Sequence, residues 1–378
     1  TAAGGKFNVK LHADSDKDGD GIIWFAAPSV STNGGSLQFG NNETTTIGGQ
    51  TVKVGGDVFF NSTSAQTLST GGGTVTVYGE TILANSSASG VSINSGGGAI
   101  DFHGVLNSGN QYTWVDKTGA ATGTGSWDAA RTEAKNGTAG GSAIGDSYLV
   151  TITSRLENSL AGLAAGYRGA WIGAYRSNTS NYNWVWADGP EANQHFFTQN
   201  AVHAGSTVPN GTTLAGQYAN FGNGEPNGGL NSDRTQTESV GQFYGTAGQW
   251  NDLIVTTRFN DPNAGIQYRV QGYVRETNLA PTKLTLNAGT GAVTINGGVG
   301  GSKALASLNV TAASTVVNGN ALKTTGAQTY DNALTVTSAT GDLAVAATTL
   351  SVTGANQALD FKAAGSITHA ANMALSTN

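Results

Sequence analysis

The stretch KLTLNAGTGAVTING, from Lys283 to Gly297, contains the pattern that decides the fold of most of this chain. Apolar residues alternate with polar ones in two short runs, Leu284–Leu286 and Val293–Ile295. A strand presents successive side chains to opposite faces, so this alternation is typical of a half-buried strand. The glycines and Asn287 between the runs are residues that tight turns prefer. The stretch therefore predicts two short strands joined by a turn.

The same pattern recurs toward both ends of the chain. In the C-terminal part, the steps from Leu284 to Leu308, Leu334 and Leu359 are 24, 26 and 25 residues. In the N-terminal part, similar runs lie near double or triple glycines, at 37–39, 58–60, 75–77 and 100–102. Periods of roughly 20 to 50 residues indicate solenoids, in which each repeat is stable only against its neighbours. We expect a mainly β fold, with a right-handed β-solenoid (β-helix) formed by residues 1–110 and 279–378.

Composition excludes several classes of protein. Glycine fills 56 of 378 positions and charged residues only 11%, which favours short strands and turns over long salt-bridged helices. The net charge of −6, without a Lys/Arg cluster, argues against nucleic acid as a partner. The absence of cysteine excludes disulfides and thiol chemistry. No run approaches the ~20 apolar residues of a membrane helix, so no membrane span is expected.

The middle of the chain, residues 111–278, differs in kind. It contains 6 of the 7 tryptophans and 4 of the 6 prolines, a shift in composition that indicates a separate domain. Ser126–Ala134 reads as a helix with a serine N-cap and an acidic first turn. Ser154–Leu160 reads as a second helix, with Glu157 at the capping-box position. We expect an α+β domain inserted between the two solenoid halves.

Six motifs in this domain occur in the order found in the C-type lectin family. They are Trp127 with its helix, Tyr148–Ser154 leading into Glu157-Asn158, Trp171-Ile172-Gly173, Trp184–Gly189, Glu225-Pro226-Asn227 and Trp250-Asn251-Asp252. Residues 111–278 therefore resemble a C-type lectin domain over essentially their whole length. The disulfides usual in that family are missing here. The resemblance implies that Trp127, Trp171, Trp184 and Trp186 belong to the core.

The resemblance also implies a calcium site. Calcium takes about six to eight hard oxygen ligands from carboxylates, amide carbonyls and water. Glu225 and Asn227 supply two of them, and the proline between them, which is cis in the family, directs both side chains the same way. Asn251 and Asp252 follow from a neighbouring strand. A further acid completes the family's site, and here Glu238 matches it best, with Asp233 as a competing ligand.

In that family, sugar hydroxyls replace water on the metal and hydrogen-bond to its ligands. The same side chains are therefore the expected carbohydrate-binding residues: Glu225, Asn227, Glu238, Asn251 and Asp252. The order Glu-Pro-Asn is associated with mannose, fucose or glucose types, whereas galactose types typically contain Gln-Pro-Asp. The alternative interpretation is that Glu225-Pro226-Asn227 is a solvated turn and Trp250-Asn251-Asp252 the end of a strand.

Other polar residues give weaker signals. His195 and His203 lie in polar stretches without a second ligand at metal spacing, so we expect surface residues and no zinc site. Asp14–Gly21 begins like an EF-hand loop, but the twelfth position from Asp14 is Phe25, where a bidentate glutamate is required. We interpret it as a solvated turn between repeats, with a weak or partial second calcium site as the alternative.

The solenoid halves resemble the filamentous-haemagglutinin-type adhesins of Gram-negative bacteria, on phrases such as Lys6–Leu11 and Thr325–Tyr330. This resemblance implies an extracellular or cell-surface adhesin or fibre that binds glycans or polysaccharide through calcium. The alternative is a matrix filament whose insert binds protein or a neighbouring subunit. A polysaccharide-degrading β-helix is a third hypothesis, but the few scattered charges favour a protein that is not an enzyme.

The two ends of the chain suggest a further partner. The sequence begins with Thr1-Ala2-Ala3-Gly4, as a mature protein or an excised segment would. Strand-like sequence starts by Phe7, and the last repeat stops at Met373–Leu375 without a polar closing helix. Open solenoid ends favour stacking on another repeat. We expect neighbouring copies to stack along a filament, or else this chain is a segment of a larger protein.

Overall fold

A computed structural model describes residues 5–14, 21–47, 50–53, 55–121, 124–177, 182–200, 209–228, 238–244, 248–261, 269–353, 357–370 and 373–377. The chain divides into two compact units. Unit 1 consists of Thr1–Gly109 and Leu279–Asn378, and unit 2 is Asn110–Asn278. The two are described separately.

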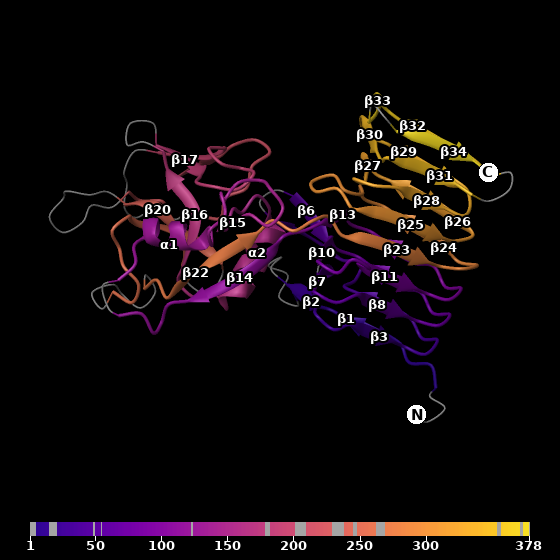
Figure 1. The fold of residues 1–378 in the computed structure, drawn as a ribbon, viewed down its shortest axis with the longest axis horizontal. Helices are drawn as coiled ribbons and strands as arrows, with labels where there is room; N and C mark the ends of the chain where they lie inside the picture. Colours follow the sequence, from indigo (N-terminus) through magenta and orange to yellow (C-terminus); the bar gives the residue numbers. More distant parts are fainter. Residues whose placement is uncertain are drawn as a thin grey trace. The chain divides into compact units, whose positions relative to one another are not determined.

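Unit 1 is built of parallel strands in three stacked arrays (Figure 1). Sheet 1 has eight strands in the order β1(Val9–Leu11), β4(Leu37–Phe39), β9(Val75–Val77), β12(Ile100–Phe102), β24(Ala292–Ile295), β26(Ser314–Asn318), β29(Leu334–Ser338) and β32(Leu359–Ala363). Sheet 3, also eight-stranded, has the order β3(Ser29–Ser31), β8(Gln66–Ser69), β11(Val91–Asn94), β23(Lys283–Asn287), β25(Ser307–Thr311), β28(Gln328–Tyr330), β31(Thr349–Val352) and β34(Ala374–Thr377).

Sheet 2 consists of two parts. A four-stranded part contains β2(Ile22–Phe25), β7(Asp57–Ser62), β10(Thr81–Asn85) and β13(Leu106–Ser108), and a three-stranded part contains β27(Ala321–Lys323), β30(Leu343–Ala346) and β33(Ile367–His369). Val299 forms single bridges to Leu106 in one part and to Leu322 in the other. A separate antiparallel pair, β5(Thr44–Ile47) and β6(Gln50–Lys53), lies between β4 and β7 in the sequence.

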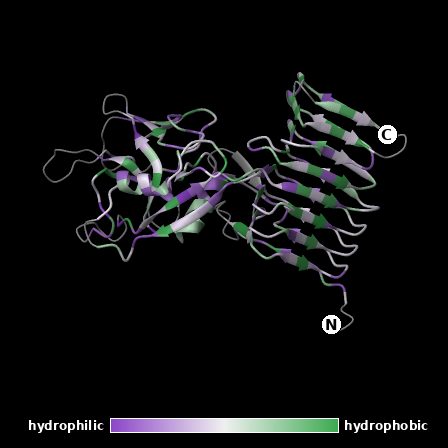
Figure 2. Cartoon of the chain, viewed as in Figure 1, coloured by the Kyte–Doolittle hydropathy of each residue, from purple (hydrophilic) through white to green (hydrophobic). Residues whose placement is uncertain are grey.

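The chain visits the three sheets in a fixed cyclic order. Each pass adds one strand to sheet 1, then sheet 2, then sheet 3, as in β9, β10 and β11, except that in the pass between β24 and β25 sheet 2 receives only the bridges of Val299. Because equivalent strands pair in register, Val75 lies between Leu37 and Ile100 in sheet 1, and all three are buried. Alternate residues point inward, and Figure 2 shows the resulting alternation of hydropathy along these strands. Their apolar side chains form one continuous core through unit 1.

Glycine is required at one recurring turn because successive turns stack backbone on backbone. A Cβ atom on Gly73 would lie 2.2 Å from the carbonyl oxygen of Gly35, and one on Gly98 would lie 2.2 Å from that of Gly73. A Cβ atom on Gly291 would lie 2.3 Å from the carbonyl oxygen of Gly98. These turns leave no room for a side chain, which accounts for part of the high glycine content.

The expected strands of unit 1 are confirmed, but the regular repeat is wrong at one step. Leu284 pairs with Leu308, and Leu334 pairs with Leu359, as the spacing predicted. Leu308 instead pairs with Gln328, because Leu334 belongs to sheet 1 and not to sheet 3. Gln328 is fully buried, and its Nε2 atom donates to the carbonyl oxygen of Ala346 at 3.1 Å. Because Gln328 is polar, the pattern of apolar residues did not show that it pairs with Leu308.

The described residues of unit 2 form two helices and a nine-stranded, mainly antiparallel sheet. Its strands are β14(Gln111–Asp116), β15(Ser147–Leu149), β16(Ala170–Arg176), β17(Asn183–Trp186), β18(His195–Gln199), β19(Gly211–Thr213), β20(Glu238–Tyr244), β21(Gln249–Ile254) and β22(Gly272–Thr277). Strand β22 pairs with β14, β15 and β16, and β20 joins β16 to β21. Neither helix in the described part of the chain has the length and apolar character needed to cross a membrane.

Both predicted helix starts are confirmed. Helix α1(Trp127–Ala134) begins after Ser126, whose hydroxyl accepts from the Ala129 N–H. Helix α2(Arg155–Ala165) begins after Ser154, whose hydroxyl accepts from the Glu157 N–H at 3.1 Å. The Glu157 carboxylate reaches back to the N–H and the hydroxyl of Thr153, both at 2.7 Å. Local capping signals thus define both helix starts.

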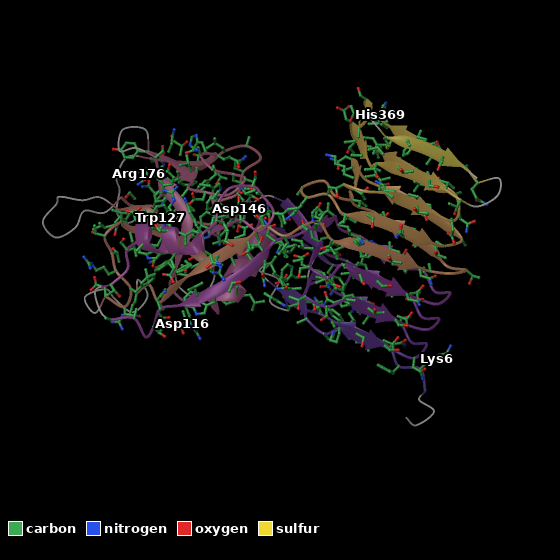
Figure 3. All side chains as sticks on the ribbon, viewed as in Figure 1. Lys6, Asp116, Trp127, Asp146, Arg176 and His369 are labelled. Atoms are coloured by element: carbon green, nitrogen blue, oxygen red, sulfur yellow. The ribbon has the colours of Figure 1, made fainter. Side chains whose placement is uncertain are left out.

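The four tryptophans assigned to the core are buried, as predicted. Trp171, Trp184 and Trp186 are fully buried, and Trp127, labelled in Figure 3, is 3% exposed. The indole N–H of Trp127 donates to the carbonyl oxygen of Ile172 at 2.8 Å. Trp250 is also fully buried and donates to the side-chain oxygen of Asn158 at 2.7 Å. These rings hold the helices and strands around the candidate site.

Candidate functional site

Strand β21 positions the loop that contains Glu225. Trp250 and Phe221 form a single parallel bridge. In it, the backbone N–H of Trp250 donates to the carbonyl oxygen of Asn220, and the N–H of Gly222 donates to the carbonyl oxygen of Trp250. The Phe221 and Trp250 rings are buried and meet edge to face, with centroids 5.5 Å apart. The beginning of the loop is therefore fixed to the strand that contains Asn251 and Asp252.

Two buried carboxamides hold the peptide around Pro226. The Glu225–Pro226 bond is cis. The carbonyl oxygen of Pro226 accepts from Nε2 of Gln199 at 2.9 Å and from Nδ2 of Asn210 at 3.0 Å. The Asn210 N–H donates to the carbonyl oxygen of Glu225 at 2.8 Å. Both amides are nearly fully buried, so the loop backbone is supported from β18 and from the approach to β19.

One backbone N–H joins the two carboxylates at the centre of the site. The Asn227 N–H donates to Oε2 of Glu225 at 3.1 Å and to Oδ1 of Asp252 at 2.9 Å. The Gly228 N–H donates to Oδ2 of Asp252 at 2.8 Å. Glu225 is 9% exposed and Asp252 is fully buried. The structure therefore brings Glu225, Asn227 and Asp252 together.

Burial raises the pKa values of both carboxyl groups, and the neighbouring Asp252 raises that of Glu225 further. Burial is the largest cause for Glu225, followed by the charge of Asp252, a side-chain hydrogen bond with it, and the charge of Glu238; its pKa rises to about 8. Burial also raises the pKa of Asp252. Among the described residues, no lysine or arginine is a main influence on the pKa of either group. At neutral pH the pair therefore shares a proton when no cation is bound.

Two amides and a third acid lie around this pair. The side-chain N–H of Asn227 donates to Oε1 of Glu225 at 3.2 Å, which places a donor beside an acceptor. The side-chain N–H of buried Asn251 donates to the backbone carbonyl of Asp252 at 2.8 Å. Glu238 is the first residue of β20 and pairs across the ladder with Ile254. Its charge acts on Glu225 from there. Asp233 lies outside the described residues.

The donor set fits a hard divalent cation such as calcium. Carboxylate and amide oxygens are the ligands that calcium takes, and a cation would offset the repulsion between two carboxylates withdrawn from water. Among the described residues, no three His, Cys, Asp or Glu side chains form a group that could hold a metal ion. A cation bound here would therefore need the amide oxygens of Asn227 and Asn251 as ligands in addition to the acids.

A second group of carboxyl side chains in unit 2 was not predicted from the sequence as a cluster. Glu276 in β22 is 2% exposed and accepts from the Asn110 side chain at 2.6 Å and from the Thr151 N–H at 3.1 Å. The Thr151 hydroxyl donates to Glu191 at 2.9 Å. Burial, then the charge of Glu157, raises the pKa of Glu276 to about 8. One signal was available: Glu276 lies two residues after Val274 and therefore points to the same, buried side of the strand.

The remaining polar predictions have mixed outcomes. His195 is half-buried and not a plain surface residue, with its Nε2 atom 3.1 Å from the carbonyl oxygen of Phe197 and 3.0 Å from the Thr198 hydroxyl. His203 lies outside the described residues. Of the Asp14–Gly21 stretch, Asp14 adopts a positive φ of 58°, and residues 15–20 are outside the described part.

No family model matches this chain, and no curated protein matches it. One solved structure that is similar to it is the cow C-type carbohydrate-recognition domain of CD23, determined in the presence of a GlcNAc2Man3 oligosaccharide. The similarity has a TM-score of 0.26 and 22% sequence identity, and it covers 45% of this chain and 88% of that one. At this TM-score the similarity is no basis for an argument about function, which has to rest on the geometry of the site.

Proposed function

We propose that unit 2 binds calcium through Glu225, Asn227, Asn251 and Asp252, with Glu238 or Asp233 as a further ligand, and that it binds glycans through this calcium. The main support is the pair of buried carboxyl groups, Glu225 and Asp252, which one N–H bridges and which have no lysine or arginine of the described residues among their main influences. Isolated buried acids are costly unless a cation or a proton neutralises them.

The sugar class follows from the donor and acceptor beside the metal position. The Asn227 amide donates to the Glu225 carboxylate in the structure, at 3.2 Å. A pair of neighbouring sugar hydroxyls can replace this contact, with one accepting from the amide and the other donating to the carboxylate. Together with the resemblance of the Glu-Pro-Asn order to mannose-type sites, this favours mannose or fucose over galactose.

Unit 1, in this proposal, is a β-solenoid that presents the binding domain. Parallel strands in register, visited in a fixed cyclic order over three sheets, support this interpretation. We infer a right-handed coil, because crossovers between parallel strands of one sheet are right-handed in nearly all cases. The whole chain then serves as an extracellular or cell-surface adhesin, where calcium sites of modest affinity are filled. Catalysis has no part in the proposal.

Calorimetry with calcium tests the metal, and a glycan array with calcium or with chelator tests the sugar. We expect Asp252→Asn to lose calcium binding and calcium-dependent glycan binding while the far-UV spectrum is unchanged. Asp116→Asn is the matched control, because Asp116 is an exposed aspartate of the same unit whose carboxylate accepts from the Thr118 N–H. Undiminished calcium affinity in both Glu225→Ala and Asp252→Asn would show that the site is assigned wrongly.

A further inference from the structure

A cavity of about 440 Å³ lies in unit 1 where sheet 2 is interrupted. Its walls come from β13, β27 and β30, which are labelled in Figure 1, and from the chain between β24 and β25. All of its lining residues belong to unit 1. Small-molecule sites in proteins have volumes of roughly 300 to 1,000 Å³, so the cavity is large enough for a ligand.

The cavity is hollow because the pass between β24 and β25 contributes almost no side chains to it. In that pass, Val299 forms the single bridges to Leu106 in β13 and to Leu322 in β27. The cavity-lining residues next to it include Gly298 and Gly301. A Cβ atom on Gly301 would have its nearest contact at 3.7 Å, so a side chain at this position would project into open space. Backbone therefore forms the floor between the two parts of sheet 2.

Two hydrogen-bond donors lie on opposite sides of this floor. Asn107 and Lys323 each follow a bridged leucine by one residue, so they occupy the same column two rows apart, with roughly 10 Å between their backbones. Asn107 is 8% exposed, and its Oδ1 atom accepts from the Ser302 N–H at 3.2 Å. Its Nδ2 atom has no hydrogen-bond partner among the described residues, and the same is true of the Lys323 ammonium. A nearly buried donor without a partner is costly, so this side of the cavity favours a ligand with an acceptor.

The other end of the cavity contains a carboxylate. Ala321 pairs with Ala344, so Asp342 lies four positions behind Lys323 along the strand direction, or roughly 13 Å between backbones. Oδ1 of Asp342 accepts from the Ser366 N–H at 2.7 Å. Lys323 and Asp342 line the same cavity, but neither forms an ion pair with any described residue. The cavity thus has a positive end and a negative end, which a ligand can contact separately.

We propose that this cavity binds a sugar acid with a single negative charge, such as a uronic acid. Its carboxylate would lie between Asn107 and Lys323, and its hydroxyl groups would donate to Asp342. An uncharged sugar would leave Lys323 unpaired, whereas a second negative charge would be repelled by Asp342. The apolar side chains of the lining are one valine and two alanines, which offer little surface to an aromatic ligand. The site goes beyond the proposed function, because none of its residues belongs to unit 2.

Saturation-transfer NMR on the full-length chain tests the proposal, with D-glucuronate as the probe and D-glucose as the uncharged control. A calcium chelator is present throughout, so the proposed calcium site makes no contribution. We expect saturable binding of glucuronate, and binding of glucose that is weaker by about tenfold or more. Lys323→Met and Asn107→Asp should each weaken glucuronate binding by about tenfold or more. Asn107→Asp keeps the acceptor for the Ser302 N–H and removes only the free donor.

Two further variants separate loss of the site from loss of the fold. Gly301→Leu should fill the cavity and abolish binding while the melting temperature stays close to that of the wild type. Lys283→Met is the matched control, because Lys283 is an exposed lysine of unit 1 outside the cavity lining, and it should bind glucuronate normally.

Three results would overturn the proposal: no saturable binding of glucuronate, equal binding of glucose, or undiminished binding in both Lys323→Met and Asn107→Asp. Failure of the proposed calcium site is seen separately, because Asp252→Asn should leave glucuronate binding in chelator unchanged.

Discussion

Calcium binding at Glu225 and Asp252 should release a proton. The pKa of Glu225 is raised to about 8 by burial and by Asp252, so at pH 7 about nine in ten unliganded molecules keep a proton on the pair. A carboxylate that binds calcium is ionised, so the metal must displace this proton. We therefore expect release of about 0.9 proton per calcium bound at pH 7, and an apparent affinity that weakens about tenfold per pH unit below pH 8.

Titration calorimetry measures both quantities. The heat of binding in buffers with different ionisation enthalpies gives the number of protons released, and the dissociation constant follows from titrations between about pH 6 and pH 9. The affinity should level off above the pKa of Glu225. Asp116→Asn, at the exposed end of β14, should leave the proton release unchanged. Calcium binding without proton release at pH 7, or an affinity constant from pH 6 to pH 8, would refute the reasoning.

Three further predictions concern unit 2. The double variant Glu225→Gln/Asn227→Asp should shift glycan preference toward galactose, because it exchanges donor and acceptor beside the metal; a wild-type preference for terminal galactose on the array would contradict this. Burial raises the pKa of Glu276 from 4.5 to about 8, so its protonated form stabilises the fold fully below pH 4.5 and this stabilisation is lost as pH rises through 8. The melting temperature should fall over that range, and less in Glu276→Gln than in the wild type; equal losses would argue against the raised pKa. Ser154→Ala removes the cap of α2 and should lower the free energy of unfolding by about 1 kcal/mol, measured by chemical denaturation, whereas an unchanged midpoint would mean that the cap contributes nothing.

Local signals in the sequence predicted much of the fold. Alternation over three or four residues was enough for strands such as Val75–Val77, and a serine followed by a glutamate was enough for the start of α2. The register of strand pairing was harder to predict, because it depends on which distant strand becomes the neighbour. Gln328 shows the difficulty: it occupies a buried column beside Leu308 and satisfies its amide through the carbonyl of Ala346, which no local pattern reveals.

The candidate site was predicted through motifs and not through physical chemistry alone. The sequence from Glu225 to Asp252 does not show that the Asn227 N–H contacts both acids. That contact depends on the pairing of Phe221 with Trp250, which holds the loop beside β21. The cluster around Glu276 was missed because its members come from a strand, a helix start and a turn. These side chains come close together only in the folded domain, so their proximity cannot be predicted from sequence spacing.

The point at which unit 2 leaves unit 1 makes unit 2 an exchangeable domain. Strand β13 pairs with β10, and β23 pairs with β11, so the rows of unit 1 continue across the insertion without a shift. Within unit 2, Gln111 lies directly opposite Thr277, which brings its two ends to within about 5 Å of each other. For unit 1, residues 110–278 are thus equivalent to a turn of a few residues. The entropy cost of bringing the two ends of this segment together is already offset by the folding of unit 2. Any domain whose ends meet in an antiparallel pair could therefore replace unit 2 without a change in the rows of unit 1.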